Sequence, residues 1–346
     1  MRSVHTNRAL LVVRLALAPV LASVFLLPGS STTVAQEAAG PLTVYSGRSE
    51  SLVGPVMEQF TEATGIQVDV RYGDTAELAA VLLEEGERTP ADLFFAQDAG
   101  ALGAVAGAGL LALLDDVTLE RVPEVFRDPD GQWVGISGRA RTVAYTTDED
   151  VVLPESILGF TDSSWSGRIG WVPANGSFQS FVTALRLTAG EEGARAWLEG
   201  IIGNDPVPYP NNTSAVEGVA AGEVDVAFVN HYYLLQLLAE HGDTFPVAQK
   251  FFEGGDVGSL INVAGVGELT TTDQPEAAAA LIEFLLGEQA QHYFAEATYE
   301  YPLIDSVEAD PRLPDLDSVE TPDVDLTDLA DLEGTVDLLR DVGAID

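Results

Sequence analysis

Two adjacent tyrosines, Tyr232 and Tyr233, are the residues whose types and spacing point most directly to chemistry. They follow an alternating, β-branched run that ends at Asn230, and a helical pattern of leucines begins after them. Neighbours inside a strand point to opposite faces, but at a strand-to-helix junction two phenol oxygens can converge. Free N–H groups in the first helical turn favour an anionic phenolate. The pair therefore predicts a site for a hard metal ion, and the alternative is two core aromatics at a junction.

The first part of the chain must position such a site, and it alternates between strand and helix patterns three times. We expect strands at 42–45, 66–70 and 92–95, and helices that end at Phe60, at Glu85 and before Gly109, with Thr75 and Asp98 as caps. This order predicts a mostly parallel α/β sheet with both faces covered. Functional groups of such a sheet lie at the carboxyl ends of its strands.

A second α/β unit is expected between about residues 165 and 260. Two strand pieces at 133–147, around Ser137-Gly138-Arg139, precede it. Further expected elements are a strand at 168–172, a turn at 173–177, helices at 178–187, 193–202 and 214–221, a strand at 262–266, and helices near 276–287 and 288–296. No linker separates the two units, which predicts two lobes joined by more than one crossing, with a ligand cleft between them.

The first 35 residues have the pattern of a signal peptide. A basic start precedes an apolar run that Pro19 and Pro28 interrupt, and the small-residue site Thr33-Val34-Ala35 follows. We therefore expect export to a periplasmic or other extracytoplasmic location. The chain has no cysteine, which excludes a lipid-modified cysteine anchor and structural disulfides.

The amino-acid composition limits the kinds of binding partner that the protein can have. The chain has 16 basic and 55 acidic residues and a net charge of −39, which argues against nucleic acid and anionic membranes. We attribute this acidity to solubility or a salty environment, because salt screens diffuse surface charge. The segment 305–346 is especially acidic. Disorder is the simple expectation for it, but its spaced Leu and Val residues favour docking on the second lobe.

Enzymatic motifs are scarce. Only four histidines occur, and neither a Gly-x-Ser-x-Gly elbow nor a phosphate-binding Gly-x-x-x-x-Gly-Lys loop is present. We therefore expect no catalysis. Because carboxylates are abundant, a hydrolase that uses cleft carboxylates remains the alternative from another class.

The chain from about Leu42 to Leu303 resembles the periplasmic ferric-ion-binding proteins of iron(III) ABC importers, which have the type II periplasmic-binding-protein fold. The motifs that carry the resemblance are Val44-Tyr45-Ser46-Gly47-Arg48, Thr64-Gly65-Ile66, Pro90-Ala91-Asp92-Leu93-Phe94, Ser137-Gly138-Arg139, Gly167-Arg168-Ile169-Gly170, Asn175-Gly176-Ser177-Phe178, Asn230-His231-Tyr232-Tyr233 and Glu300-Tyr301-Pro302-Leu303. Each motif is weak alone, but their order and spacing are specific.

The resemblance implies that Tyr232 and Tyr233 bind transported Fe(III) as phenolates. Fe(III) is a hard acid that suits anionic oxygen, and its charge can hold phenols deprotonated below their usual pKa of about 10. The resemblance also implies a companion anion, such as carbonate or phosphate. Its expected contacts are Asn175, Gly176 and Ser177, before a helix where N–H groups suit an anion, together with Arg139, Asn212 and Asn230. For Asn175-Gly176 the alternative is a simple tight turn.

Two positions depart from the family pattern. Members place a histidine where this chain has Ser49 and a glutamate where it has Gln97. Serine and glutamine are poor iron ligands, so Ser49 and Gln97, with Tyr145, are only secondary metal candidates. His231 is expected to support the pair rather than bind metal. We therefore expect iron to be held mainly from one side, with anions or water completing its shell.

The resulting hypothesis is an exported solute receptor that delivers Fe(III) to an ABC permease in the membrane and works as a monomer. Its first lobe would comprise residues 41–138 and 262–304, its second lobe 139–261, and hinge motion would close the cleft. An alternative with the same fold is a receptor for a small oxyanion or a ferric chelate, in which the tyrosines stack or donate hydrogen bonds.

Overall fold

The computed structural model describes residues 40–147 and 151–346, and the predicted signal peptide lies outside them. The strands are β1 (Leu42–Ser46), β2 (Val68–Tyr72), β3 (Leu93–Ala96), β4 (Val134–Thr146), β5 (Ile169–Trp171), β6 (Val207–Pro208), β7 (Val226–Asn230), β8 (Val247–Lys250), β9 (Ile261–Glu268) and β10 (Tyr301–Pro302). The α-helices are α1 (Glu50–Thr64), α2 (Thr75–Glu85), α3 (Ala99–Gly107), α4 (Asp116–Leu119), α5 (Gly176–Gly203), α6 (Asn212–Ala220), α7 (His231–His241), α8 (Pro275–Leu285), α9 (Glu288–Glu296) and α10 (Leu332–Asp341).

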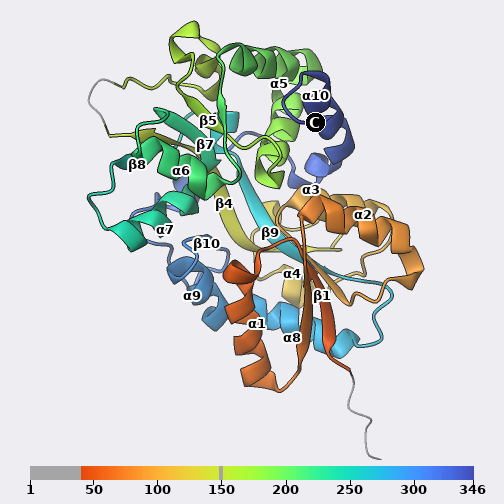
Figure 1. The fold of residues 1–346 in the computed structure, drawn as a ribbon. Coiled ribbons are helices and arrows are strands. Elements are labelled where there is room, and N and C mark those ends of the chain that lie inside the picture. Colours follow the sequence, from red (N-terminus) through yellow and green to blue (C-terminus); the bar gives the residue numbers. More distant parts are fainter. Residues whose placement is uncertain (1–39, 148–150) are drawn as a thin grey trace, which may run out of the picture. The chain divides into compact units, whose positions relative to one another are not determined.

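These strands form one mixed sheet in the order β2-β1-β3-β9-β4-β7-β5-β6, and β8 and β10 pair with β4 (Figure 1). The expected parallel pairs occur in two groups, β2-β1-β3 and β7-β5-β6. Antiparallel strands β9 and β4 join the groups. We call the elements around β1–β3 the first lobe and those around β5–β7 the second lobe.

Strand β4 corrects one sequence prediction, because it is a single strand rather than two pieces around Ser137-Gly138-Arg139. Its first half pairs with β9 and β10, and its second half pairs with β7 and β8. A register shift between Gly135 and Ser137 is the only irregularity in its pairing with β9. Gly138 serves packing instead of turning, since a Cβ there would lie 3.2 Å from side-chain atoms of Tyr301 and Leu303. Gly138 therefore marks a close approach of β4 to β10.

Helices cover both groups of strands through apolar contacts. In the first lobe, α1 meets α8 through Phe60 and Phe284, whose ring centroids lie 5.5 Å apart. In the second lobe, Trp197 of α5 packs on Phe228 of β7 at 5.7 Å and on Phe181 at 5.3 Å. Burial of each such side chain contributes roughly 1.5–3 kcal/mol. The second of these clusters holds α5, whose first turn carries part of the candidate site.

Helix boundaries follow local sequence signals. Helix α1 ends at Gly65, which has φ 79°. Helix α2 is capped by Asp74, whose side chain accepts N–H bonds from Ala76 and Glu77, so the expected cap at Thr75 was displaced by one residue. The two helices expected at 178–187 and 193–202 are joined end to end as α5. Gly190 (φ 76°, ψ 166°) breaks the helical path between them.

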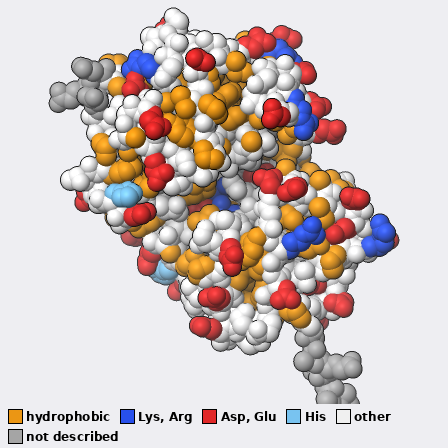
Figure 2. Space-filling model, in the orientation of Figure 1, with side chains coloured by type: hydrophobic (Ala, Val, Ile, Leu, Met, Phe, Trp, Pro, Cys, Tyr) orange, Lys and Arg blue, Asp and Glu red, His pale blue; other side chains and the backbone are white. Residues whose placement is uncertain are grey.

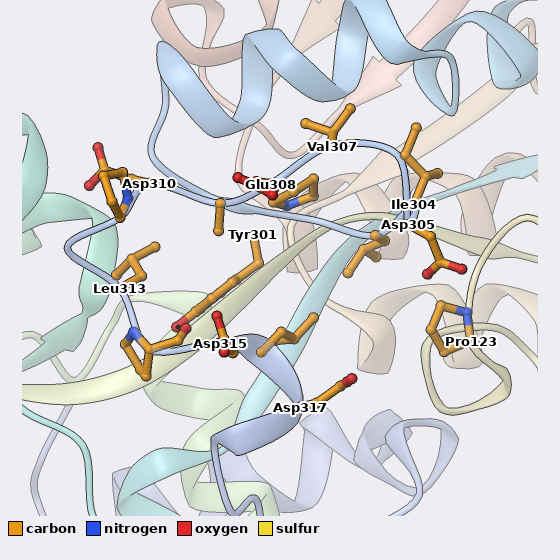
Figure 3. Close-up of a pocket in the computed structure, with 16 residues that line it drawn as sticks. Pro123, Tyr301, Ile304, Asp305, Val307, Glu308, Asp310, Leu313, Asp315 and Asp317 are labelled. Carbon is orange, nitrogen blue, oxygen red and sulfur yellow. Dashed lines mark hydrogen bonds between the residues drawn. The ribbon is translucent and has the colours of Figure 1, made fainter.

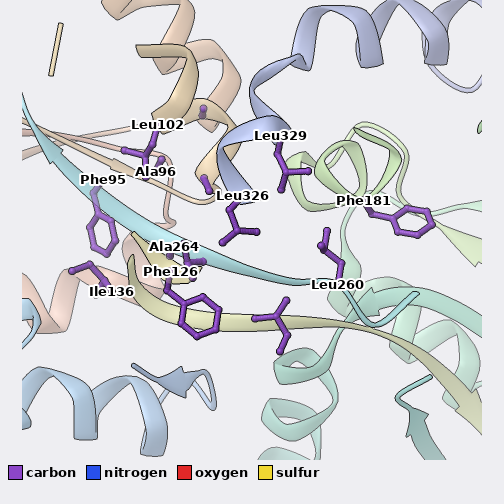
Figure 4. Packing of buried hydrophobic residues seen from close by; sticks show 14 of the residues in the cluster. Phe95, Ala96, Leu102, Phe126, Ile136, Phe181, Leu260, Ala264, Leu326 and Leu329 are labelled. Atoms are coloured by element: carbon purple, nitrogen blue, oxygen red, sulfur yellow. The ribbon is translucent and has the colours of Figure 1, made fainter. Parts of the chain in front are cut away.

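The acidic C-terminal segment is ordered and contacts both α5 and α3. The hydroxyls of Thr183 and Thr335 lie 2.7 Å apart, and Arg186 of α5 pairs with Asp331 at 2.7 Å. On the other side, the short helix Leu326–Ala330 lies against α3, where a Cβ at Gly100 would come within 2.3 Å of the Leu329 carbonyl oxygen. Figure 4 shows Leu326 and Leu329 among buried residues that include Leu102, Leu260 and Phe181. The tail was expected on the second lobe; it also reaches the first.

Candidate metal and anion site

The tyrosine pair lies at the start of α7, directly after β7. The ring centroids of Tyr232 and Tyr233 are 4.2 Å apart with an interplanar angle of 35°. Tyr232 is fully buried, and its hydroxyl has no hydrogen-bond partner among the described residues. Asn230 occupies the N-cap position but forms no side-chain cap, which leaves the first turn of α7 open to an anionic group. Both phenols therefore sit where a helix end favours negative charge.

Burial strongly opposes ionisation of Tyr233 when no cation is bound. The pKa of Tyr233 is raised well above its ordinary value, first by desolvation and then by Tyr232, while Asn212 and Arg48 act in the opposite direction. A bound metal ion would supply the charge that phenolates need. An unpartnered buried hydroxyl has the same implication, because buried polar groups normally find a partner.

Arg48, which follows β1 in the first lobe, lies close to both tyrosines. Its side chain is almost fully buried, and its Nη2 donates to Glu300 Oε1 at 2.5 Å. Burial lowers the pKa of Arg48, but attraction to Glu300, then to Tyr232 and Tyr233, outweighs this and raises it. Arg48 Nε has no hydrogen-bond partner in the described chain. The first lobe thus places a cation beside the second lobe's phenols.

Arg139 and Arg141 add two more buried cations. They are two residues apart in β4 and so lie on one face of the strand. Arg139 Nη2 donates to the Val263 carbonyl at 3.3 Å, while its Nε and Nη1 have no partner among the described residues. Desolvation, followed by repulsion from Arg48, lowers the pKa of Arg139.

Arg141 was not predicted as a site residue. Its Nη1 donates to Asn230 Oδ1 at 3.1 Å and to Ser177 Oγ at 3.4 Å. Desolvation lowers its pKa to about 10, although both tyrosines favour its charged form. Its spacing of two from Arg139 was the signal that could have revealed it. The structure thus brings Arg141 together with two predicted anion contacts.

The remaining residues predicted to contact the anion lie at the N-termini of two helices, α5 and α6. Asn175 caps α5, and its Oδ1 accepts bonds from Ser177 N at 3.0 Å and Ser177 Oγ at 2.6 Å. A Cβ at Gly176 would lie 3.8 Å from Asp98 Oδ2 of the first lobe. Asn212 begins α6, and neither polar atom of its buried side chain has a hydrogen-bond partner in the described residues. Asn175 thus engages Ser177 internally, whereas the side chain of Asn212 acts on Tyr233, whose pKa it lowers.

The secondary metal candidates come from three different segments of the chain. Tyr145 pairs with Val226, four residues along β4 from the Arg141–Asn230 pair, which corresponds to roughly 13 Å. Ser49 is exposed at the start of α1, where its Oγ lies 3.1 Å from Ser51 Oγ. Gln97 follows β3, and its buried Nε2 has no partner within the described residues.

His231 is a structural residue. Its Nδ1 accepts a bond from Ala140 N at 3.1 Å, and its Nε2 lies 2.8 Å from the Tyr299 carbonyl. Both ring nitrogens are therefore engaged by backbone, and desolvation lowers the pKa of His231 to about 4. Its ring packs edge-on against Tyr232 at 5.8 Å. Neutral His231 thus orients the pair.

Other features of the described chain offer no competing metal site. Within residues 40–147 and 151–346, no three His, Asp or Glu side chains are arranged to hold a metal ion. A cavity of about 750 Å³ is lined by Pro123 and by residues 301–317, not by the tyrosine pair (Figure 3). Figure 2 shows a hollow near the middle of one face with a Lys or Arg side chain inside it. No helix in the described part of the chain is long and apolar enough to cross a membrane.

The arrangement of buried cations beside two phenols can hold a ligand. Two α/β lobes share strands, and buried polar groups from both lobes converge beside an unpartnered phenol. These features define a solute receptor with the type II periplasmic-binding-protein fold.

Comparison with known proteins gives the family. Residues 88–328 match the model described as bacterial extracellular solute-binding protein. The chain is 31% identical over 327 residues to the major ferric iron-binding protein of Neisseria meningitidis, which covers 92% of this chain and 98% of that protein. It is 30% identical to the Fe(3+)-binding periplasmic protein of Serratia marcescens, over 88% of this chain and 90% of that one.

Comparison with solved structures finds proteins of the same kind. Iron-bound HitA from Pseudomonas aeruginosa matches with a TM-score of 0.84 and 34% identity, over 88% of this chain and 100% of that chain. The chain therefore belongs to the bacterial extracellular solute-binding protein family. This membership overturns the hydrolase alternative.

Proposed function

We propose that this protein captures Fe(III) outside the cytoplasm, with Tyr232 and Tyr233 as phenolate ligands and a small anion as companion, and delivers it to an ABC permease. The observation that carries the proposal is the buried hydroxyl of Tyr232, which has no hydrogen-bond partner among the described residues and whose ring is tilted against that of Tyr233 at the first turn of α7. The relatives' ferric names support iron as the cargo.

The companion anion is supported by the surplus of buried positive charge. Arg48, Arg139 and Arg141 lie near the pair, whereas Glu300 and Asp98 are the acidic groups that act on them. Two phenolates do not neutralise a trivalent cation, so an anion of carbonate or phosphate type balances the remaining charge. Its proposed contacts are Asn175, Gly176, Ser177, Asn212 and Asn230, together with Arg139 and Arg141.

The lobe boundaries are part of this proposal. A change of lobe near residue 139 coincides with the point in β4 where pairing passes from β9 to β7. Because Ser49 and Gln97 replace the stronger first-lobe ligands of related proteins, water or the anion fills the remaining iron positions. The receptor acts as a monomer whose lobes close over the cargo.

A ferric titration tests the function. Phenolate complexes of Fe(III) absorb visible light, so apo-protein titrated with ferric citrate is expected to develop a coloured band at one iron per chain. Tyr232→Phe with Tyr233→Phe is expected to abolish the band while retaining the fold. Tyr145→Phe is the matched control, because Tyr145 lies along β4 away from the pair, and it is expected to keep the band.

The same titration separates the alternatives. Calorimetric binding of citrate or phosphate without iron, and without any band, would identify a receptor for an oxyanion. A band that survives the double substitution would show that other residues bind the iron. Either result contradicts the proposal.

A further inference from the structure

Arg48 is a buried cation that is not among the proposed contacts of the companion anion. It comes from the loop after β1, next to Ser49, where the first lobe lacks a strong metal ligand. Its side chain is 1% exposed. A guanidinium cannot coordinate Fe(III), but it can donate hydrogen bonds to phenolate oxygen and stabilise its charge.

Glu300 fixes Arg48 in place. Besides the ion pair with Arg48, its Oε2 accepts bonds from Ser137 Oγ at 3.1 Å and Thr298 Oγ1 at 3.2 Å. Both Glu300 oxygens are thereby occupied, and the carboxylate is fully buried. Such a network orients a side chain far more firmly than an exposed pair does.

Two buried polar atoms near the Arg48–Glu300 pair have free hydrogen-bonding capacity. Arg48 Nε and the Tyr232 hydroxyl both lack hydrogen-bond partners among the described residues. Glu300 follows Tyr299, whose carbonyl oxygen lies 2.8 Å from Nε2 of His231, the residue directly before Tyr232. The ion pair with Glu300 therefore holds Arg48 beside the tyrosine pair. A donor with spare capacity therefore sits next to an oxygen that gains negative charge when it binds metal.

From this geometry, and resting on the proposed iron function, we infer that Arg48 is a positioning residue: held by Glu300, it orients Tyr232 and Tyr233 and stabilises their metal-bound phenolates. Through Arg48, the first lobe contributes a charge interaction with the phenolates instead of a direct metal ligand. Groups that support metal ligands in this way are commonly worth about 10–100-fold in metal affinity.

The phenolate-to-iron charge-transfer band reports this role directly. A positive charge beside the phenolate lowers the energy of its donor electrons more than that of the more distant iron orbitals. Arg48→Gln is therefore expected to shift the band to longer wavelength and to speed iron release to a competing chelator about tenfold or more. Arg48→Lys, which keeps the charge but not the fork of donors, is expected to restore part of both effects.

Glu300→Gln is a second variant, and it is expected to shift the charge-transfer band in the direction opposite to Arg48→Gln. The amide oxygen of glutamine can still accept the hydrogen bond from Arg48 Nη2 and hold this side chain in place. Because the substitution removes the negative charge beside Arg48, the band is expected to move to shorter wavelength. Arg48→Gln leaves Glu300 buried and unpaired. If that variant fails to fold, Glu300→Gln and Arg48→Lys still test the inference. Arg71→Gln, at a half-exposed arginine of the first lobe, is the control and is expected to change neither readout.

The outcomes distinguish this inference from the function itself. If the wild type shows no band, the iron proposal fails. If the wild type shows the band and folded Arg48→Gln keeps the same wavelength and release rate, the role of Arg48 is overturned. Identical behaviour of Arg48→Lys and Arg48→Gln, or an unshifted band in Glu300→Gln, would likewise overturn it.

Discussion

Arg141 of β4 and Asn230 of β7 are direct register partners, and Arg141 Nη1 donates to Asn230 Oδ1 at 3.1 Å. Because Asn230 ends β7 immediately before α7, this bond connects a buried cation to the start of the tyrosine-bearing helix. It also holds Arg141 within reach of Ser177 at the start of α5. Three elements of the candidate anion site are thus joined through one guanidinium.

Arg141→Gln is expected to weaken binding of the companion anion about tenfold, because a bond between charged groups is replaced by a neutral one. Calorimetric titration of the iron-loaded protein with phosphate measures this change. The fold should persist, since burial of the charge already lowers the pKa of Arg141 to about 10. Arg195→Gln, a half-exposed residue of α5 paired with Asp341, is the control. Unchanged phosphate affinity would exclude Arg141 from the anion site.

Gly100→Ala is expected to destabilise the protein by about 1–3 kcal/mol through overpacking. A methyl at this position would meet the Leu329 carbonyl oxygen at 2.3 Å and push the C-terminal segment away from α3. Gly107→Ala in the same helix is the matched control, since a Cβ there meets nothing within 4 Å. Alanine favours helix, so the control should be neutral or slightly more stable. Thermal melting and limited proteolysis of the tail provide the measurements, and equal behaviour of the two variants would contradict tight packing on α3.

Glu268→Gln is expected to raise the melting temperature at neutral pH. Desolvation, followed by the charges of Asp92 and Glu276, raises the pKa of Glu268 above its ordinary 4.5. A carboxyl whose pKa is raised by folding destabilises the fold when it is ionised, and this effect disappears as the pH falls through the folded pKa. The advantage of the glutamine variant should therefore be present at pH 7, shrink as the pH falls through the raised folded pKa, and be lost below the ordinary pKa of 4.5. A constant advantage across this range would show that charge is not its cause.

The sequence was sufficient for features that depend on neighbouring residues. Alternation and helical spacing predicted the strand-to-helix junction at Tyr232 and Tyr233, and the capping signal at Asp98 predicted the start of α3. Gly190 separates the two helical segments of α5 where the sequence suggested a gap. Each of these features follows from backbone preferences that act within a few residues.

Features that depend on distant parts of the chain were missed. Arg48 and Glu300 are 252 positions apart, so no local pattern could show that they form a buried pair. Gly138 resembled a turn residue because its packing against Tyr301 and Leu303 involves a segment far along the chain. Arg141 could have been predicted from the sequence, because it lies two residues from Arg139 and residues two apart in a strand share a face.

Strand β4 has a consequence for the cooperativity of unfolding. Its first half is bonded to β9 and its second half to β7 and β8, so one uninterrupted backbone contributes to both lobes. Melting either lobe removes hydrogen bonds from a strand that the other lobe still needs. The lobes are therefore a single thermodynamic unit, although they move as two bodies in the proposed closure. A receptor built this way is expected to open and close without either lobe passing through a partly unfolded state.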